Sequence, residues 1–218
     1  MHARSKSLGT RNQPEQTRAA ILHAAFEEFA NLGVAGARTD AIARAAGVNK
    51  ALIYYYFKSK DALYLAIVER HLKEFSTQAL ELLSSDRSVQ DKVLDYVSMH
   101  FDFIAGRTEY PRLFQRFMMA DSRPFMRIRQ KYFAPVAKKF QSVIAQGIRS
   151  GELAASDSRH TAISLVALNV FYFSAAPVLK AAGIINDPYR KSQLARRKKE
   201  VLNFAHRALF TNREAVPK

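Results

Sequence analysis

The sequence predicts an all-α protein. Apolar residues recur every three or four positions through most of the chain, as Leu22, Phe26 and Phe29 do, and this is the spacing of one helix face. Glycine, proline and small polar residues fall between these periodic segments, where helices begin and end. No segment alternates apolar and polar residues beside a hairpin turn, so no strand is expected.

The first three predicted helices are short and separated by glycines. The first covers residues 15–32 and is ended by Gly33, because glycine readily adopts the left-handed conformation that closes a helix. Thr39 is expected to cap a second helix over residues 39–45, which Gly47 stops. Asn49 is expected to cap a third helix that ends near Phe57.

Six further helices bring the predicted total to about nine. N-cap residues or proline mark their starts, and glycine or small polar residues mark most of their ends. Their expected ranges are 60–83, 88–104, 111–119, 124–150, 157–177 and 187–210. Pro135 is expected to kink the helix over 124–150, and Pro177 to end or bend the next one.

The charge of the chain predicts a polyanionic partner. The 218 residues include 34 Lys+Arg and 19 Asp+Glu, which gives a net charge of +15. Residues 1–60 carry 9 basic and 4 acidic residues, and residues 180–218 carry 10 and 3. The second excess centres on the run Arg196–Lys199, which is expected to be a solvated helix face more often than a contact surface.

Composition also excludes several classes of site. With no cysteine there are no disulfides, no cysteine-ligated metal and no thiol nucleophile, and a reducing cytoplasm is the expected location. The six histidines have no metal-binding spacing, and neither a phosphate-binding glycine loop nor a Gly-x-Ser-x-Gly turn is present. We therefore expect no enzyme, no metal and no cofactor. No run of residues approaches the ~20 apolar residues needed to cross a bilayer, so no membrane partner is expected.

Residues 15–62 have the dimensions of a helix-turn-helix domain, whose last two helices are joined by Ala46-Gly47-Val48. The apolar, glycine and capping residues of this domain also resemble, in identity and spacing, the DNA-binding head of the tetracycline-repressor (TetR) family. The residues that carry the resemblance are Arg18, Ile21, Leu22, Ala24, Ala25, Phe29, Gly33, Thr39, Ile42, Ala43, Ala46, Gly47, Val48, Ile53, Tyr54, Phe57, Lys60 and Leu63.

The resemblance implies a DNA-binding transcription regulator with a three-helix head at 15–62, a basic flexible arm at 1–14, and a ligand-binding and dimerisation body at 63–218. It implies contacts to bases and phosphates along the third helix, and contacts of Thr39 and Lys60 to the DNA backbone. The DNA-binding residues expected are Arg38, Thr39, Asn49, Lys50, Ala51, Leu52, Tyr54, Tyr55, Tyr56 and Lys60.

Helical geometry orients the third helix without the family. At 100° per residue, Ile53 and Phe57 point in one direction, as a core pair does, while Ala51 and Tyr55 point in the opposite direction. Three consecutive tyrosines cover too much of the circumference for all of them to be buried. At least one of them is therefore expected to be exposed or to contact DNA, where an apolar surface can meet thymine methyl groups.

The body supplies residues for a small-molecule pocket and a dimer interface, the two features that the family resemblance implies. Plain core packing is the competing interpretation for each aromatic residue, and a hydrogen-bonded core histidine is the competing one for His100. The pocket candidates are Met99, His100, Phe103, Phe114, Arg116, Phe117, Met118, Phe125, Asn169, Tyr172 and Phe173. The interface candidates, on the last two helices, are Leu165, Leu168, Leu202, Ala205 and Leu209.

The function predicted is that of a homodimeric repressor in the cytoplasm, released from a palindromic double-stranded operator by a small-molecule inducer. The ligand would stabilise a body conformation in which the two heads no longer match successive major grooves. The alternative is a helical carrier of lipids or other hydrophobic ligands, or a basic membrane-surface protein that uses residues 187–210. That alternative explains the phenylalanine-rich body but leaves the helix-turn-helix pattern unexplained.

Overall fold

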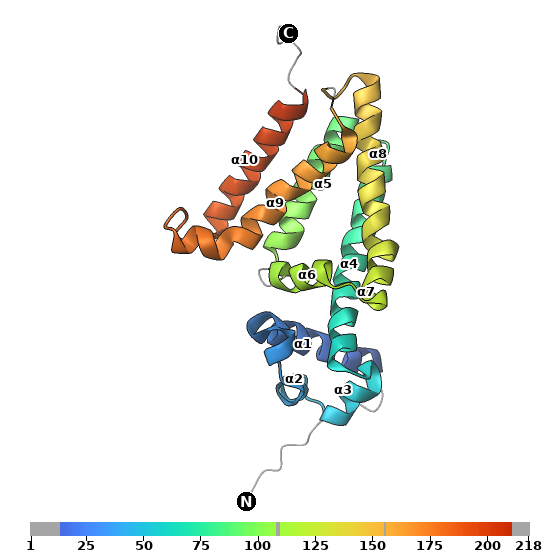
Figure 1. Cartoon of the computed structure of the whole chain (residues 1–218), viewed down its shortest axis with the longest axis vertical. Coiled ribbons are helices and arrows are strands. Elements are labelled where there is room, and N and C mark those ends of the chain that lie inside the picture. Colours follow the sequence, from blue (N-terminus) through green and yellow to red (C-terminus); the bar gives the residue numbers. More distant parts are fainter. Residues whose placement is uncertain (1–13, 108–109, 155, 211–218) are drawn as a thin grey trace, which may run out of the picture. The chain divides into compact units, whose positions relative to one another are not determined.

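The computed structural model of the chain describes residues 14–107, 110–154 and 156–210, and every regular element in these ranges is a helix (Figure 1). The predicted arm therefore lies outside the described residues, apart from Pro14. The chain forms two compact units, Met1–His71 with Arg112–Phe125 and Leu72–Pro111 with Met126–Lys218. Helix α4, Lys60–Ser84, contributes to both units, and the boundary expected between residues 62 and 63 lies inside it.

The first unit, called the head below, begins with three helices close to those predicted. They are α1 (Pro14–Gly36), α2 (Thr39–Ala45) and α3 (Lys50–Phe57). Gly33 has φ 68° and ψ 166°, so regular helical geometry breaks within α1 at the residue predicted to end it. The head also contains α6, Tyr110–Met119, whose predicted range of 111–119 is confirmed.

Of the two caps predicted for these helices, that of Asn49 is confirmed and that of Thr39 is wrong. The Asn49 side-chain oxygen accepts a hydrogen bond from the Leu52 backbone N–H over 2.9 Å, as expected of an N-cap. Ser59 Oγ accepts from the Ala62 N–H over 3.0 Å at the start of α4. Thr39, in contrast, is the first residue inside α2, and the N-cap position belongs to Arg38, which makes no side-chain cap bond.

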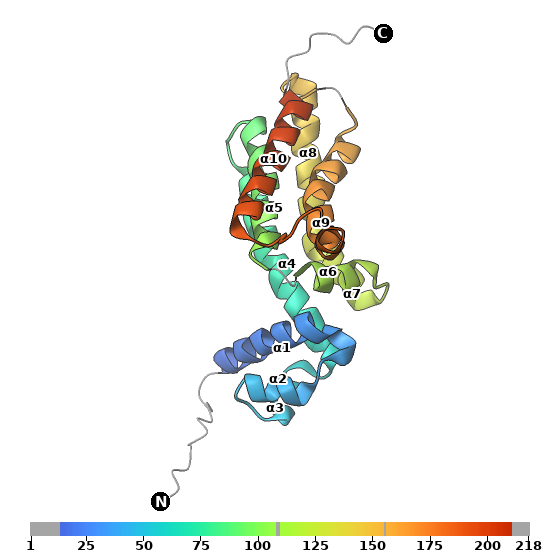
Figure 2. The same cartoon turned by 90° about the vertical axis from the view of Figure 1, so that its left-hand side faces the viewer.

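The second unit, called the body below, contains the remaining helices and the C-terminal half of α4. They are α5 (Val89–Ala105), a π-helix η1 (Arg129–Phe133), α8 (Ala134–Ser150), α9 (Ser158–Ala181) and α10 (Lys191–Phe210). Helix α7, Arg123–Ile128, leads into η1. Two views show α5 beside α8, α9 and α10 (Figures 1 and 2), and all three pack against it.

Pro135 and Pro177 both lie within helical segments of the body. The expected helix over 124–150 consists of α7, η1 and α8, with a π-helical turn directly before Pro135. Proline lacks an N–H and its ring crowds the preceding turn, and a widened turn accommodates both effects. Pro177 lies inside α9, which continues to Ala181. The last helix begins at Lys191, and Asp187 instead forms a turn in which its backbone oxygen accepts from the Arg190 N–H.

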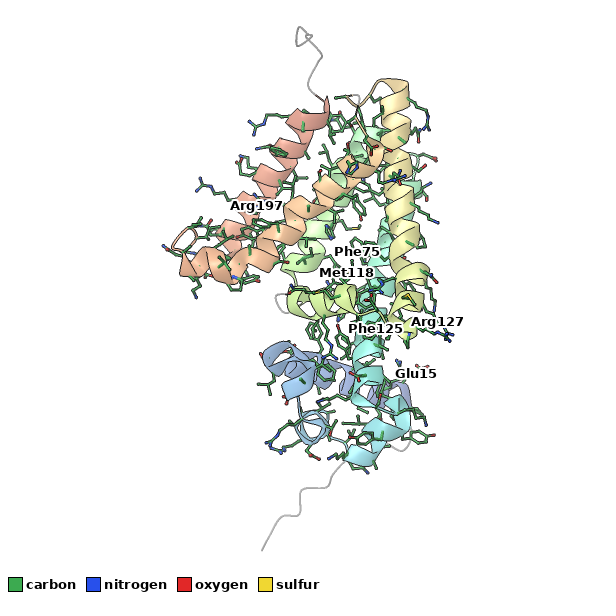
Figure 3. The ribbon with its side chains drawn as sticks, viewed as in Figure 1. Glu15, Phe75, Met118, Phe125, Arg127 and Arg197 are labelled. Atoms are coloured by element: carbon green, nitrogen blue, oxygen red, sulfur yellow. The ribbon has the colours of Figure 1, made fainter. Side chains whose placement is uncertain are left out.

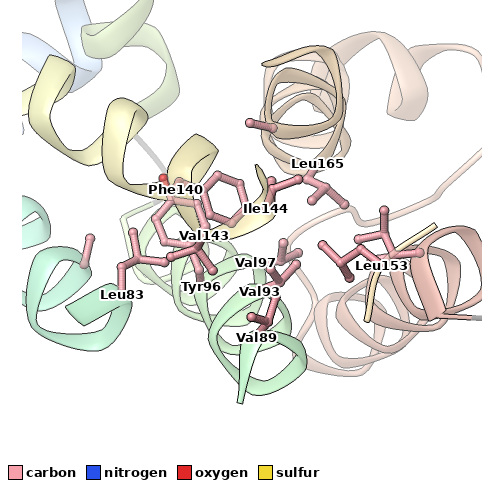
Figure 4. Close-up of a cluster of buried hydrophobic side chains, with 14 of the residues drawn as sticks. Leu83, Val89, Val93, Tyr96, Val97, Phe140, Val143, Ile144, Leu153 and Leu165 are labelled. Carbon is pink, nitrogen blue, oxygen red and sulfur yellow. The ribbon is translucent and has the colours of Figure 1, made fainter. Parts of the chain in front are cut away.

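The core of the body lies where α5, α8, α9 and α10 meet (Figure 4). Tyr96 and Phe140 stack there with ring centroids 4.0 Å apart. Gly147 is required by close packing, since a Cβ at this position would lie 2.6 Å from Val89 Cγ1 and 2.7 Å from Leu153 Cγ. The main buried residues are Leu83, Val89, Val93, Tyr96, Val97, Val136, Phe140, Val143, Ile144, Leu153, Leu165, Val201, Ala205 and Leu209.

The expectation that no segment is long enough to cross a bilayer was wrong for α9. This helix has 24 residues and an 18-residue window of mean hydropathy 1.8, so by length and composition alone it could span a membrane. Core helices of soluble proteins pass the same test. Of that window 28% is buried inside the chain, and Ile163, Phe171 and Val178 of α9 are exposed.

Candidate nucleic-acid interface and ligand-binding body

Helix α3 has one buried face and one exposed face. Ile53 and Phe57 are 1% and 4% exposed, whereas Tyr54 and Tyr55 are 41% and 69% exposed. The predicted rotation of this helix is therefore confirmed. Two exposed tyrosines leave apolar ring surface in contact with water, which is unfavourable. Their rings and hydroxyl groups can instead contact base edges and phosphates.

The tyrosines also contact one another. The rings of Tyr55 and Tyr56 meet edge to face with centroids 5.3 Å apart, and Tyr56 is half-buried. Tyr56 in turn lies 6.3 Å from the ring of the buried Phe57. A chain of ring contacts thus links the exposed Tyr55 to the core of the head, which restricts the rotamers that Tyr55 can adopt.

The N-terminal part of α3 is exposed and partly charged. Ala51 is exposed and Leu52 is half-buried. The ammonium of Lys50 lies 3.0 Å from a carboxylate oxygen of Asp40 in α2, and both side chains are about half exposed or more. An ion pair at such a surface adds little stability, so Lys50 can exchange this partner for a phosphate at low cost.

The residues outside α3 that were predicted to contact DNA differ in their exposure and in the hydrogen bonds that they already make within the head. Thr39 is half-buried at the start of α2, and Arg38 is exposed. The Arg38 backbone N–H donates to Glu28 Oε1 over 3.1 Å, so its amide is already engaged while its guanidinium extends from an exposed residue. The side-chain oxygen of Asn49 is used as the α3 cap.

Lys60 has a structural role that the sequence did not reveal. Its Nζ donates to the backbone oxygens of Ala35 and Ala37, at 3.1 Å each. These carbonyls lie where α1 ends and the chain turns toward α2, so the ammonium joins the start of α4 to that connection. Two of its three N–H groups are engaged within the head. Lys58, two residues earlier, was not predicted as a site residue and is exposed.

The predicted ligand-binding residues are divided between the two units. Phe117 and Phe125 belong to the head, where they are 0% and 8% exposed and their ring centroids lie 5.9 Å apart. Phe125 (Figure 3) also contacts the ring of Tyr64. Phe114 is half-buried beside Phe117, and Met118 is 41% exposed. The buried rings serve the core of the head, which was the competing interpretation for these residues.

In the body, Met99 and Phe103 line an open groove of about 640 Å³ between α4 and α5. The groove is mostly polar, and its lining residues include two ion pairs. Arg107 pairs with Glu74 at 2.7 Å and its guanidinium lies 4.2 Å from the centre of the Phe103 ring. The remaining lining residues are Gln78, Leu82, Arg87, Asp95, Ser98 and Asp102.

Asn169 and His100 form a polar contact inside the body. Asn169 is fully buried in α9, and its Nδ2 donates to the Val97 backbone oxygen over 2.9 Å and lies 3.3 Å from His100 Nδ1. Burial lowers the pKa of His100 to about 4, so the imidazole is neutral and its Nδ1 can accept the amide hydrogen bond. Phe75 packs against the same ring at 5.5 Å (Figure 3), so the core-histidine interpretation fits His100.

Tyr172 and Phe173 belong to a second buried cluster. The Tyr172 hydroxyl donates to the Pro188 backbone oxygen over 2.7 Å, and burial raises its pKa. Phe173 packs against Phe101 with ring centroids 5.0 Å apart. Arg197 lies over the Tyr172 ring and donates to the Leu168 backbone oxygen over 2.8 Å (Figure 3). These contacts hold α10 against α9.

The leucines predicted at a dimer interface face the chain's own core. Leu165, Ala205 and Leu209 are 4%, 0% and 6% exposed, while Leu168 and Leu202 pack against the same cluster. The exposed apolar residues of α9 are instead Ile163, Phe171 and Val178, at 58%, 67% and 68%. Positions 163, 171 and 178 are eight and seven residues apart, so they fall on one side of the helix. Among the described residues, no cluster of histidine and acidic side chains could hold a metal ion.

Comparison with known proteins gives a family match that lies in the head. Residues 21–67, which include α2, α3 and the start of α4, match the family model described as bacterial regulatory proteins, tetR family. The chain is 28% identical over 177 residues to the HTH-type transcriptional regulator RutR of Escherichia coli strain K12. The aligned region covers 81% of this chain and 83% of the relative.

Two solved structures share the fold of nearly the whole chain. The transcriptional regulator FadR of Bacillus subtilis in complex with stearoyl-CoA is 19% identical with a TM-score of 0.69, and the match covers 87% of this chain and 98% of that one. AibR in complex with isovaleryl coenzyme A and operator DNA is 14% identical with a TM-score of 0.71, covering 86% and 97%.

The helix-turn-helix match, the named relatives and the fold agree with one another. The chain is a DNA-binding transcriptional regulator whose head matches the tetR family of bacterial regulatory proteins.

Proposed function

We propose that this regulator is a cytoplasmic homodimeric repressor that binds a palindromic operator through α3 of each head and leaves it when a small ligand binds the body. The exposed Tyr54–Tyr55 face of α3 carries the proposal. The buried Ile53 and Phe57 fix the rotation of the helix, so the tyrosines are presented on a rigid element. Rigid presentation is what readout of base edges requires.

The dimer is proposed to form through the exposed side of α9. Ile163, Phe171 and Val178 would leave a large apolar surface in water in an isolated chain, and Phe204 on α10 adds a further exposed ring at 56%. A two-fold symmetric dimer uses the same patch on both copies and presents two heads to two half-sites. This arrangement explains why an apolar helix of 24 residues needs no membrane.

The inducer is proposed to be a coenzyme A thioester. Two structural neighbours hold such ligands, stearoyl-CoA in FadR and isovaleryl-CoA in AibR. An acyl chain needs apolar surroundings and the phosphates of the coenzyme need cations, and this chain has a phenylalanine-rich body and a net charge of +15. Linkage requires that ligand and operator weaken each other's binding by the same factor.

The test begins with selection of bound fragments from the host's own DNA, which identifies the operator. Affinity for that operator is then measured in the presence of acyl-CoA thioesters of short and long chain length, with free coenzyme A as the control. We expect a palindromic site and release by a thioester but not by coenzyme A alone. A bound thioester that leaves operator affinity unchanged would rule out this mechanism of release, and selection of no preferred sequence would rule out operator binding.

A further inference from the structure

Between α3 and α4 the chain turns at a single residue, Lys58. Lys58 has φ 64° and ψ −39°, and it is the one non-glycine residue with positive φ in the described part of the chain. The Ser59 N–H donates to the Phe57 backbone oxygen over 2.7 Å, which closes a three-residue γ-turn around Lys58. The Lys58 N–H donates to the Tyr54 backbone oxygen over 2.9 Å and ends α3.

This conformation is costly for a lysine. A side chain at positive φ crowds its own backbone, and glycine would adopt the same turn without that strain. Strained backbone is maintained where the surrounding structure fixes it, and it occurs frequently at functional sites. Here α3 and α4 are held on both sides by the buried residues Phe57 and Leu63. The turn therefore has a structural reason, but the presence of lysine in it has none.

The turn separates two lysines that are only two residues apart in the sequence. Lys60 points to the backbone oxygens of Ala35 and Ala37 and is half-buried. Lys58 is exposed, and its Nζ lies 5.9 Å from the centre of the Tyr55 ring. In the described ranges, no ion pair to a carboxylate involves Lys58. Its ammonium is thus next to the most exposed tyrosine of α3, and no carboxylate in the described ranges neutralises it.

We propose that Lys58 is a DNA phosphate-binding residue of the head, and that Lys60 serves to hold the α1–α2 connection against α4. The proposal rests on the proposed function, because it requires α3 to be the helix that enters the groove. A phosphodiester flanking that groove would meet Lys58 at the end of α3, beside the base-reading ring of Tyr55. A flexible point charge of this kind holds phosphate and carries little sequence information.

The test measures binding of the full-length protein to a random-sequence duplex at several salt concentrations, so that no operator is needed. Lys58→Gln should reduce the slope of log K against log salt by about 0.9 for each head that contacts DNA. At 0.1 M salt this corresponds to about eightfold weaker binding per contacting head. Lys58→Arg should retain the slope, and Lys73→Gln, which removes an exposed lysine of α4 outside the head, is the matched control with no change.

A second pair of variants separates charge from fold. Lys58→Gly should lower the slope as Lys58→Gln does while raising the melting temperature, because glycine relieves the turn. Lys60→Met should lower the melting temperature, with a slope close to that of the unsubstituted protein. An unchanged slope for Lys58→Gln, or a lowered slope for Lys60→Met in a fully folded protein, would overturn the assignment. If the unsubstituted protein showed no salt-dependent binding to any duplex, the proposed function would fail instead.

Discussion

The hydroxyl of Tyr64 in α4 donates to the backbone oxygen of Leu113 in α6 over 2.5 Å, across 49 residues of sequence. Tyr64 is fully buried, and its ring also contacts Phe29 of α1 and Phe125. Arg116 of α6 lies over the same ring and pairs with Asp61 at 3.3 Å. Through this tyrosine, α6 becomes part of the DNA-binding head although it is distant in the sequence.

Tyr64 is expected to make stability sensitive to alkaline pH. Burial, opposed in part by the charge of Arg116, raises the pKa of Tyr64 from 10.0 to about 12. Between these values the unfolded chain loses a proton that the folded chain keeps, so stability falls as pH rises from 10 to 12. Tyr64→Phe should lower stability at neutral pH by about 1 kcal/mol and weaken this alkaline dependence. Denaturant unfolding at neutral and alkaline pH measures both effects. A Tyr64→Phe profile parallel to that of the unsubstituted protein would contradict the assignment.

Lys60 is expected to stabilise the head. Lys60→Met keeps the aliphatic stem and removes the donor to the Ala35 and Ala37 backbone oxygens, which should cost about 1–2 kcal/mol. Denaturant unfolding followed by circular dichroism measures the loss. Lys50→Met is the control, because its partner Asp40 is exposed and the pair should contribute less than about 1 kcal/mol. Equal losses for the two variants would show that the Lys60 contacts are no stronger than a surface ion pair.

Tyr55 is expected to read sequence without supporting the fold. Tyr55→Ala should weaken operator binding by about 1–3 kcal/mol while random-duplex binding and the melting temperature stay nearly unchanged. Ile53→Ala, on the opposite face of α3, should instead lower stability by about 2–4 kcal/mol, since Ile53 is 1% exposed. Titrations on both duplexes with a melting curve for each variant distinguish the two faces. Equal weakening on operator and random duplex would show that Tyr55 contacts only the DNA backbone.

His100 is expected to destabilise the body in acid. Its pKa of about 4 lies below the ordinary 6.5, so between these values the unfolded chain binds a proton that the folded chain excludes. Stability should therefore fall by about 1–3 kcal/mol as pH drops from 6.5 to 4. His100→Gln should lack this part of the dependence. Unfolding free energies at several pH values in this interval test it, and identical profiles for the two proteins would exclude His100 as the cause.

Phe171 is expected to lie at the contact between two copies. Phe171→Glu should convert the dimer to a folded monomer, because the substitution places charge in an apolar interface without touching the core. Leu168→Ala, three residues away on the inward-packed side, should lower stability but leave the dimer intact at concentrations where it is folded. Sedimentation velocity gives the mass of each variant. A Phe171→Glu protein that remains a dimer would place the interface on another surface.

Several elements were readable from the sequence because their signals are local. Gly33 has the positive φ predicted at a helix end, and Asn49 makes the predicted cap bond to Leu52 within four residues of chain. Ile53 and Phe57 are buried as their four-residue spacing indicated. In each case the geometry of one helix or one turn decides the outcome, and distant parts of the chain do not enter.

Other assignments depended on partners that no local pattern contains. Helix α9 is apolar on nearly every side, so its sequence could not show that Leu165 faces the core while Phe171 faces outward. Only packing against α5 and α8 selects between those faces. Likewise Lys60 and Lys58 are indistinguishable as two lysines near a turn. Their difference is set by the backbone oxygens of Ala35 and Ala37, 25 and 23 residues earlier in the chain.

The sequence by itself thus determined the all-α class, most helix boundaries and the orientation of α3, because backbone propensity, capping and helical periodicity act over a few residues. The tertiary structure alone decided that Phe117 and Phe125 fill the core of the head around Tyr64. It also decided that Asn169 contacts His100, 69 residues away. Such contacts depend on which helix faces meet in space, and a side chain's role follows from the groups that the fold places against it.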